Sequence, residues 1–105
     1  MTDKVLVLST AGNEPEARKI AHELVELRLA ACVNIVPRIQ SVYRWEGKVE
    51  TAEEYLLVIK TTKSRSGEVQ GAIRELQSYD LPECIVISVE SGSEEYLKWI
   101  EDSVR

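Results

Sequence analysis

The sequence contains no apolar run long enough to cross a membrane, and its N-terminus lacks the basic and apolar regions of a signal peptide. It also lacks an excess of positive charge, because 18 Asp and Glu residues outnumber 13 Lys and Arg residues and the net charge is -5. A protein that binds the nucleic-acid backbone needs a basic surface. The 105 residues therefore predict a single cytosolic domain that binds neither membranes nor nucleic acid.

Histidine and cysteine are scarce. The single histidine, His22, lies among polar residues of a predicted helix, and no nucleophile is paired with a base, so we expect no enzymatic activity. The two cysteines, Cys32 and Cys84, lie in separate apolar segments without the spacing of a metal or redox pair. We expect both to be small buried side chains in a reducing compartment, with a soft-metal or redox role as the alternative.

The longest feature that is present is an extended segment from Ala31 to Thr62, which folds back at 46–48. Apolar residues alternate along its first limb and fill both faces of its second limb, so the pattern predicts two paired strands joined by a tight turn at Gly47. Each limb has about 13 residues and would span about 40 Å. A domain of this size is only about 33 Å across. We therefore expect the hairpin to project beyond its domain and to be covered by other copies of the chain.

The remaining segments predict a strand and a helix before the hairpin, and a helix, a strand and a third helix after it. They are a strand at 4–9, a helix capped by Asn13 and ending near Leu29, a helix capped by Ser64 or Ser66, a strand at 85–89 and a helix capped by Ser93. Pro37 is expected to mark a bulge or an edge position in the first limb of the hairpin.

This order of elements is that of a β-α-β-β-α-β ferredoxin-like α+β domain, which would occupy residues 1–105. Such a domain has a four-stranded antiparallel sheet with two helices on one face. The third helix is an addition at the C-terminus. It could cover the other face of the sheet or lie against a neighbouring subunit.

Two groups of polar residues are candidate ligand sites. Lys60 and Thr61 lie where a strand leads toward a helix, and cations and hydroxyl groups at such a place can hold an anion or metabolite. Tyr79, Asp80 and Glu83 lie in a predicted loop, and their oxygen atoms suit a hard divalent cation. In both cases the alternative is a set of solvated surface groups.

Five segments, distributed over nearly the whole chain, carry a resemblance to a known family. They read LAACVNI at 29–35, SVYRWEGK at 41–48, LVIKTT at 57–62, YDLPE at 79–83 and YLKWI at 96–100. In this order and spacing they resemble the CutA family, the divalent-cation tolerance proteins.

The resemblance implies a ferredoxin-like subunit that assembles as a PII-like homotrimer through its long strands. It also implies that a divalent metal such as copper or zinc, or a small effector, binds in clefts between subunits, with no obligatory cofactor. The residues that we place in such a cleft are Lys60, Thr61, Tyr79 and Cys32 as ligand-binding residues, and Glu83 and Asp80 as metal ligands.

Two departures from the family pattern bear on the metal. Ser9 and Gln77 stand where relatives carry Cys and His, and both changes remove ligands that would suit copper. Copper-specific binding by that route is therefore not expected. Two alternatives remain open, a PII-like metabolite or nucleotide sensor and a purely structural trimeric scaffold.

Overall fold

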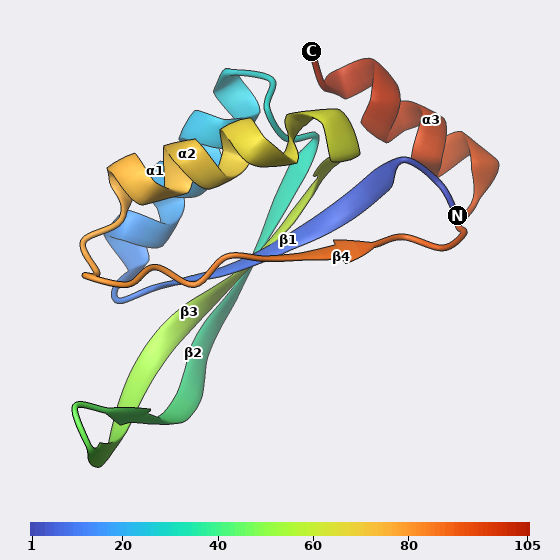
Figure 1. The fold of residues 1–105 in the computed structure, drawn as a ribbon. Coiled ribbons are helices and arrows are strands. Elements are labelled where there is room, and N and C mark those ends of the chain that lie inside the picture. Colours follow the sequence, from blue (N-terminus) through green and yellow to red (C-terminus); the bar gives the residue numbers. More distant parts are fainter.

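The computed structural model describes residues 1–105 and contains one four-stranded antiparallel sheet (Figure 1). The strands are β1 (Lys4–Ala11), β2 (Cys32–Trp45), β3 (Lys48–Thr62) and β4 (Ile85–Ser88), in the order β2-β3-β1-β4. The helices are α1 (Glu14–Glu26), α2 (Ser66–Leu76) after a short 3-10 turn at Lys63–Arg65, and α3 (Glu94–Ser103). The ferredoxin-like α+β fold with an additional C-terminal helix is therefore confirmed.

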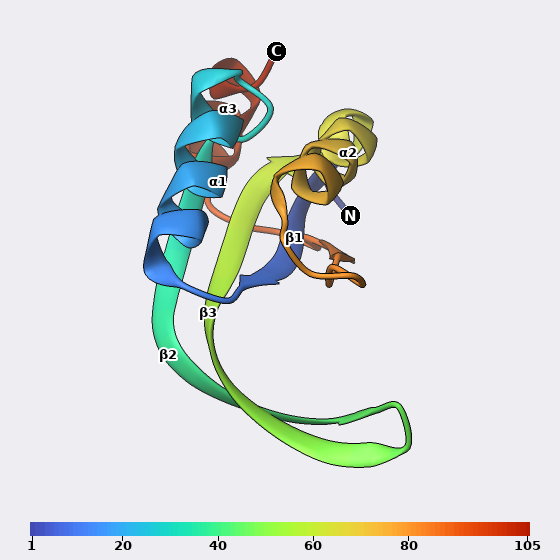
Figure 2. The same cartoon turned by 90° about the vertical axis from the view of Figure 1, so that its left-hand side faces the viewer.

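Helices α1 and α2 cover one face of the sheet, and the hydrophobic core lies between them and the strands (Figures 1 and 2). Odd-numbered residues of β1 and β3 point toward these helices, since Val7 pairs with Ile59 and both are fully buried. The core cluster consists of Val5, Val7, Ala11, Ala17, Ile20, Leu24, Ala30, Leu57, Ile59, Val69 and Ile73. Side chains that alternate along each strand therefore place one apolar set under the helices.

The opposite side of the sheet, which we call the open face, is also apolar. It carries Leu6 and Leu8 of β1, Val58 of β3 and, by strand register, Ile85 and Ile87 of β4. Ile85 and Ile87 are 51% and 43% exposed. Helix α3 packs against β1 and β3 at one end of this face, and the Arg28 guanidinium in the loop after α1 donates to its Asp102 carbonyl, so most of the open face has no covering element.

The β2-β3 hairpin projects beyond the rest of the molecule, as the sequence predicted (Figure 2). Glu46 and Gly47 both have positive φ angles, 49° and 81°, which makes a two-residue type I′ turn. The pairing of β2 with β3 shifts between Val36 and Ile39, which confirms the bulge expected at Pro37. We call the outer part of the hairpin, residues 39–54, the arm.

Some predicted boundaries were wrong. Helix α1 ends at Glu26 and not near Leu29, because Arg28 takes a left-handed conformation with a φ of 59° and turns the chain toward β2. Neither Ser64 nor Ser66 caps α2, since the helix continues directly from the 3-10 turn and the Ser66 hydroxyl donates to the Lys63 carbonyl.

Two predicted helix caps are confirmed, whereas the burial predicted for the cysteines was wrong in part. Asn13 and Ser93 cap α1 and α3 by accepting hydrogen bonds from backbone N–H groups, as expected. Cys32 and Cys84 are half-buried free thiols and not the fully buried side chains that we expected. No helix of the structure combines the length and the hydropathy that crossing a membrane requires.

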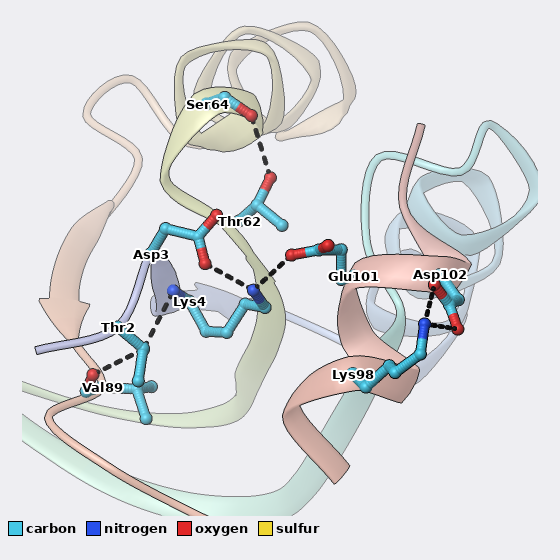
Figure 3. Close-up of polar contacts among 9 residues, drawn as sticks. All are labelled: Thr2, Asp3, Lys4, Thr62, Ser64, Val89, Lys98, Glu101 and Asp102. Carbon is cyan, nitrogen blue, oxygen red and sulfur yellow. Dashed lines mark hydrogen bonds and ion pairs between the residues drawn. The ribbon is translucent and has the colours of Figure 1, made fainter. Parts of the chain in front are cut away.

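A buried lysine connects the first strand to α3 (Figure 3). The Lys4 side chain is only 7% exposed, and its ammonium donates to Asp3 and to Glu101, the latter at 2.9 Å. These two hydrogen bonds raise the pKa of Lys4. Nearby, the Thr2 hydroxyl donates to the Val89 carbonyl at 2.7 Å. The N-terminus, the segment after β4 and α3 are thus held together by polar contacts at one end of the sheet.

Lys4 is buried whereas its two partners, Asp3 and Glu101, are mostly exposed, and this difference leads to a stability prediction. Asp3→Ala combined with Glu101→Ala leaves the Lys4 ammonium buried without an anionic partner, and we expect a loss of about 2 kcal/mol in the free energy of unfolding. Lys4→Met leaves unpaired only two carboxylates that are mostly exposed, so it should cost less than about 1 kcal/mol. Urea unfolding followed by circular dichroism measures both. A larger loss for Lys4→Met than for the double variant would contradict this assignment.

Candidate functional site

A groove of about 700 Å³ lies between the arm and the loop that joins α2 to β4. Figure 2 shows the arm curving so that its outer part lies across from this loop. We call this space the arm groove. It is lined by Thr10, by residues 41–45 and Glu54 of the arm, and by Tyr79, Asp80, Leu81 and Glu83 of the loop.

Hydrogen bonds to β1 and α1 fix the loop that forms one wall of the groove. The Gln77 side-chain amide donates to the Thr10 carbonyl, and the Ser9 hydroxyl donates to the Glu83 carbonyl at 2.8 Å. The Ser78 backbone N–H donates to Glu16 of α1 at 2.8 Å. Ser9 therefore contacts the segment that carries Tyr79, Asp80 and Glu83, and Gln77 attaches the start of this loop to β1.

Tyr79 connects the loop to the base of the arm. Its hydroxyl donates to Glu54 at 2.7 Å, and burial, followed by this hydrogen bond, raises the pKa of Tyr79 well above its ordinary value. Strand β1 ends at Ala11, and the next residue, Gly12, leaves room for the tyrosine, since a Cβ atom there would lie 3.0 Å from the Tyr79 hydroxyl oxygen. Tyr79 therefore fills the space beside β3 that β1 leaves free.

The carboxylates of the arm groove have no basic partner. Burial and the nearby Glu54 raise the pKa of the half-buried Glu83. Glu54, Asp80 and Glu83 take part in none of the ion pairs of the chain. Arg44, the only basic residue that lines the groove, donates to the Gly47 carbonyl at the hairpin turn at 3.4 Å. The groove is therefore an acidic environment.

The other predicted site residues lie elsewhere. The Lys60 ammonium is on the open face, 3.2 Å from the Tyr96 hydroxyl and 5.5 Å from the centroid of its ring. Cys32 pairs with Lys60 across the β2-β3 ladder. Thr61 points into the core, where it is fully buried and its hydroxyl donates to the Leu29 carbonyl at 2.6 Å.

The structure thus separates the predicted residues into two groups within one chain. Tyr79, Asp80 and Glu83 meet at the arm groove, whereas Lys60 and Cys32 lie together on the open face. Lys60 is six residues from Glu54 along β3, which corresponds to about 20 Å in an extended strand. A single cleft that contains both groups would need two copies of the chain, and it stays a prediction.

A single chain does not assemble a complete set of metal ligands. No group of three or more His, Cys, Asp or Glu side chains is arranged to hold a metal ion. Asp80 and Glu83 supply oxygen atoms, which suit hard cations, and the thiol of Cys32 lies with Lys60 on the open face. Within one chain, the predicted metal ligands Asp80 and Glu83 are therefore not joined by a third side chain of these types.

Sequence reasoning missed the part that the arm contributes to the site. Glu54, Tyr43 and Trp45 line the groove, and the contact between Tyr79 and Glu54 spans 25 residues of sequence. No local pattern marks such a contact, because it depends on how the loop packs beyond the end of β1.

Comparisons with known proteins identify relatives of this chain. A family model described as CutA1 divalent ion tolerance protein matches residues 5–103. The divalent-cation tolerance protein CutA of Thermus thermophilus is 43% identical over 98 residues, which are 93% of this chain and 95% of that protein. The chloroplastic protein CutA of Arabidopsis thaliana is 43% identical over 101 residues, which are 96% of this chain but only 56% of that protein.

A solved structure agrees with these matches. The crystal structure of CutA from Xylella fastidiosa has a TM-score of 0.97 and 40% sequence identity, and the match covers 99% of this chain and 100% of that chain.

The raised pKa of Glu83 predicts a pH-dependent gain in stability on substitution. An acid whose pKa is raised by folding destabilises the folded state above that raised pKa, and this penalty vanishes below the ordinary pKa. Glu83→Gln removes the charge, so it should raise the unfolding temperature at about pH 8 and give no such gain at about pH 4. Asp80→Asn, at an exposed carboxylate of the same loop, is the control. Equal effects of Glu83→Gln at both pH values in scanning calorimetry would contradict the prediction.

Proposed function

Because this chain belongs to the CutA1 divalent ion tolerance family, we propose that it is a homotrimeric binding protein with a role in divalent-cation tolerance. It binds a divalent metal of the copper or zinc type, or a small effector, in clefts between its subunits. It performs no bond-making chemistry.

The main support for the proposed assembly is the exposed apolar surface of the open face. Only 19 of the 105 residues are buried, and the large apolar side chains of β4 remain exposed. An apolar sheet face and the free edges of β2 and β4 are both costly in water, and both are covered when copies of the chain pack together. A ring of heterologous contacts closes with three copies, which is the number that the family resemblance implies.

Assembly would also unite the two groups of predicted site residues. We place Lys60 and Cys32 of one subunit opposite Tyr79, Asp80 and Glu83 of the next. In this arrangement Asp80 and Glu83 supply the first oxygen ligands to a divalent cation, and the neighbouring subunit completes the set. In this arrangement Thr61 helps to hold in place the part of β3 that carries Lys60, because its hydroxyl donates to the Leu29 carbonyl.

An anionic effector is the second candidate ligand, and Lys60 favours it. The Lys60 ammonium belongs to no ion pair of the chain, and its polar contact is the neutral Tyr96 hydroxyl. A cation without an anionic partner at a subunit contact is suited to a phosphate or carboxylate group of a metabolite. The protein would then act as a PII-like sensor.

A cytosolic location also remains a prediction, since the Arabidopsis thaliana relative is named as chloroplastic.

The assembly is tested by a charge placed on the open face. Ile87→Asp should dissociate the trimer, because the subunit contact would bury a carboxylate without a partner. Leu27→Asp is the matched control, since Leu27 is 57% exposed at the end of α1 and away from the open face. Sedimentation velocity should show small species for Ile87→Asp and an unchanged assembly for Leu27→Asp. An intact Ile87→Asp assembly would place the interface elsewhere.

The ligand is tested by calorimetry with zinc chloride, copper chloride and adenosine triphosphate. Asp80→Asn combined with Glu83→Gln should weaken metal binding at least about tenfold, because two of the ligands are lost. Lys60→Met should weaken nucleotide binding by a similar factor and leave metal binding unchanged, if the anion is the ligand. Titrations of the unmodified protein that show no heat with any of the three would support a structural scaffold.

A further inference from the structure

The arm leaves the sheet at one residue pair, and two features of the fold meet there. The pairing of β1 with β3 ends at Ala11 and Tyr55, so Glu54 is the first residue of β3 without a β1 neighbour. The register shift in β2 ends at Ile39, which pairs with Glu54. A bulge bends its strand and increases the local twist. Glu54 therefore lies where the arm turns away from the rest of the sheet (Figure 2).

The contacts of the hairpin with itself hold the direction of the arm only weakly. Beyond Tyr55 the arm is a two-stranded ribbon, and such a ribbon is marginally stable in water without further packing. At the bulge, Pro37 has no N–H group to donate, and Arg38 takes a left-handed conformation with a φ of 59°. The ion pair of Arg38 with Glu53, at 3.7 Å, joins two exposed side chains of the same hairpin, and such pairs contribute little.

Tyr79 supplies a contact from outside the hairpin. Among the hydrogen bonds and ion pairs of the arm side chains, only the one from the Tyr79 hydroxyl to Glu54, at 2.7 Å, reaches another part of the chain. A carboxylate acceptor makes this one of the stronger kinds of hydrogen bond. The loop that carries Tyr79 is itself attached to α1, where the Ser78 N–H donates to Glu16 at 2.8 Å. The contact thus connects the base of the arm to the helices that cover the core.

Gly12 is fitted to this contact. A Cβ atom at this position would lie 3.0 Å from the Tyr79 hydroxyl oxygen and 3.4 Å from its ring, which is tighter than ordinary van der Waals contact. A larger residue at position 12 would therefore push the tyrosine aside. The missing side chain of Gly12 keeps the hydroxyl of Tyr79 within reach of Glu54.

We propose that the contact between Tyr79 and Glu54, which we call the brace, sets the direction of the arm and so prepares it to meet a neighbouring subunit. This proposal rests on the homotrimer of the proposed function and adds a role for Tyr79 that needs no ligand. An arm of variable direction must be ordered when subunits meet, and the lost conformational freedom weakens association. A braced arm is ordered before the contact forms.

Dilution of the full-length protein, followed by sedimentation equilibrium, tests the brace. Tyr79→Phe removes only the hydroxyl group, and we expect it to raise the concentration at which half of the assembly dissociates about tenfold. Gly12→Ala should shift this concentration in the same direction, because it displaces the tyrosine. Tyr55→Phe is the matched control, since Tyr55 is next to Glu54 in β3 but packs against the core on the opposite face, and it should cause no shift.

Hydrogen exchange separates the brace from a general effect on stability. In the Ile87→Asp background, Tyr79→Phe should speed the exchange of backbone amides at 39–54 about tenfold and leave the core amides of Val7 and Ile59 unchanged. A variant with both Tyr79→Phe and Glu54→Ala should behave like Tyr79→Phe alone, because both substitutions remove the same contact. An equal acceleration at Val7 and Ile59 would overturn the brace, since Tyr79 would then support the fold as a whole.

The results also distinguish this proposal from the homotrimer on which it rests. An assembly that Tyr79→Phe leaves unchanged, with unchanged exchange in the arm, would overturn the brace and leave the homotrimer standing. An unmodified protein that is a single chain at micromolar concentration would contradict the homotrimer and, with it, the role of the brace in assembly. Faster arm exchange in Tyr79→Phe would in that case still support a brace within the chain.

Discussion

The mismatch in length between β1 and β3 is the constraint on which the rest of the structure depends. β3 has 15 residues and β1 has 8, so β1 pairs only with the inner part of β3, from Thr62 to Tyr55. Beyond that point β3 has β2 as its single neighbour, and the two continue as the arm. The arm groove exists because the loop after α2 fills the space next to this unpaired part of β3, where Tyr79 meets Glu54.

The same strands serve two surfaces. Because side chains alternate, β1 and β3 present one apolar set to α1 and α2 and another to the open face. The first set gives the chain its core. The second set, with the exposed residues of β4, is the surface that we propose other copies of the chain cover. In the proposed trimer, assembly and ligand binding would be linked, because the contact that covers the open face would also bring Lys60 near the acidic groove of a neighbour.

Short-range patterns predicted most of the fold and only part of the site. The hairpin, its bulge and the Asn13 cap depend on neighbouring residues, and all were foreseen. The pairing of Lys60 with Thr61 as joint ligands ignored the alternation of a strand, which places the two side chains on opposite faces. Glu54 could not be foreseen, because its contact with Tyr79 depends on how a distant loop packs against the arm.

The central claim is that this chain needs other copies to cover its open face and its arm. Sedimentation equilibrium of the unmodified protein at micromolar concentration tests it most directly. The account predicts a single species of three times the chain mass of 11.9 kDa. A well-folded species with the mass of one chain would contradict it, and the cleft between subunits would then have no basis.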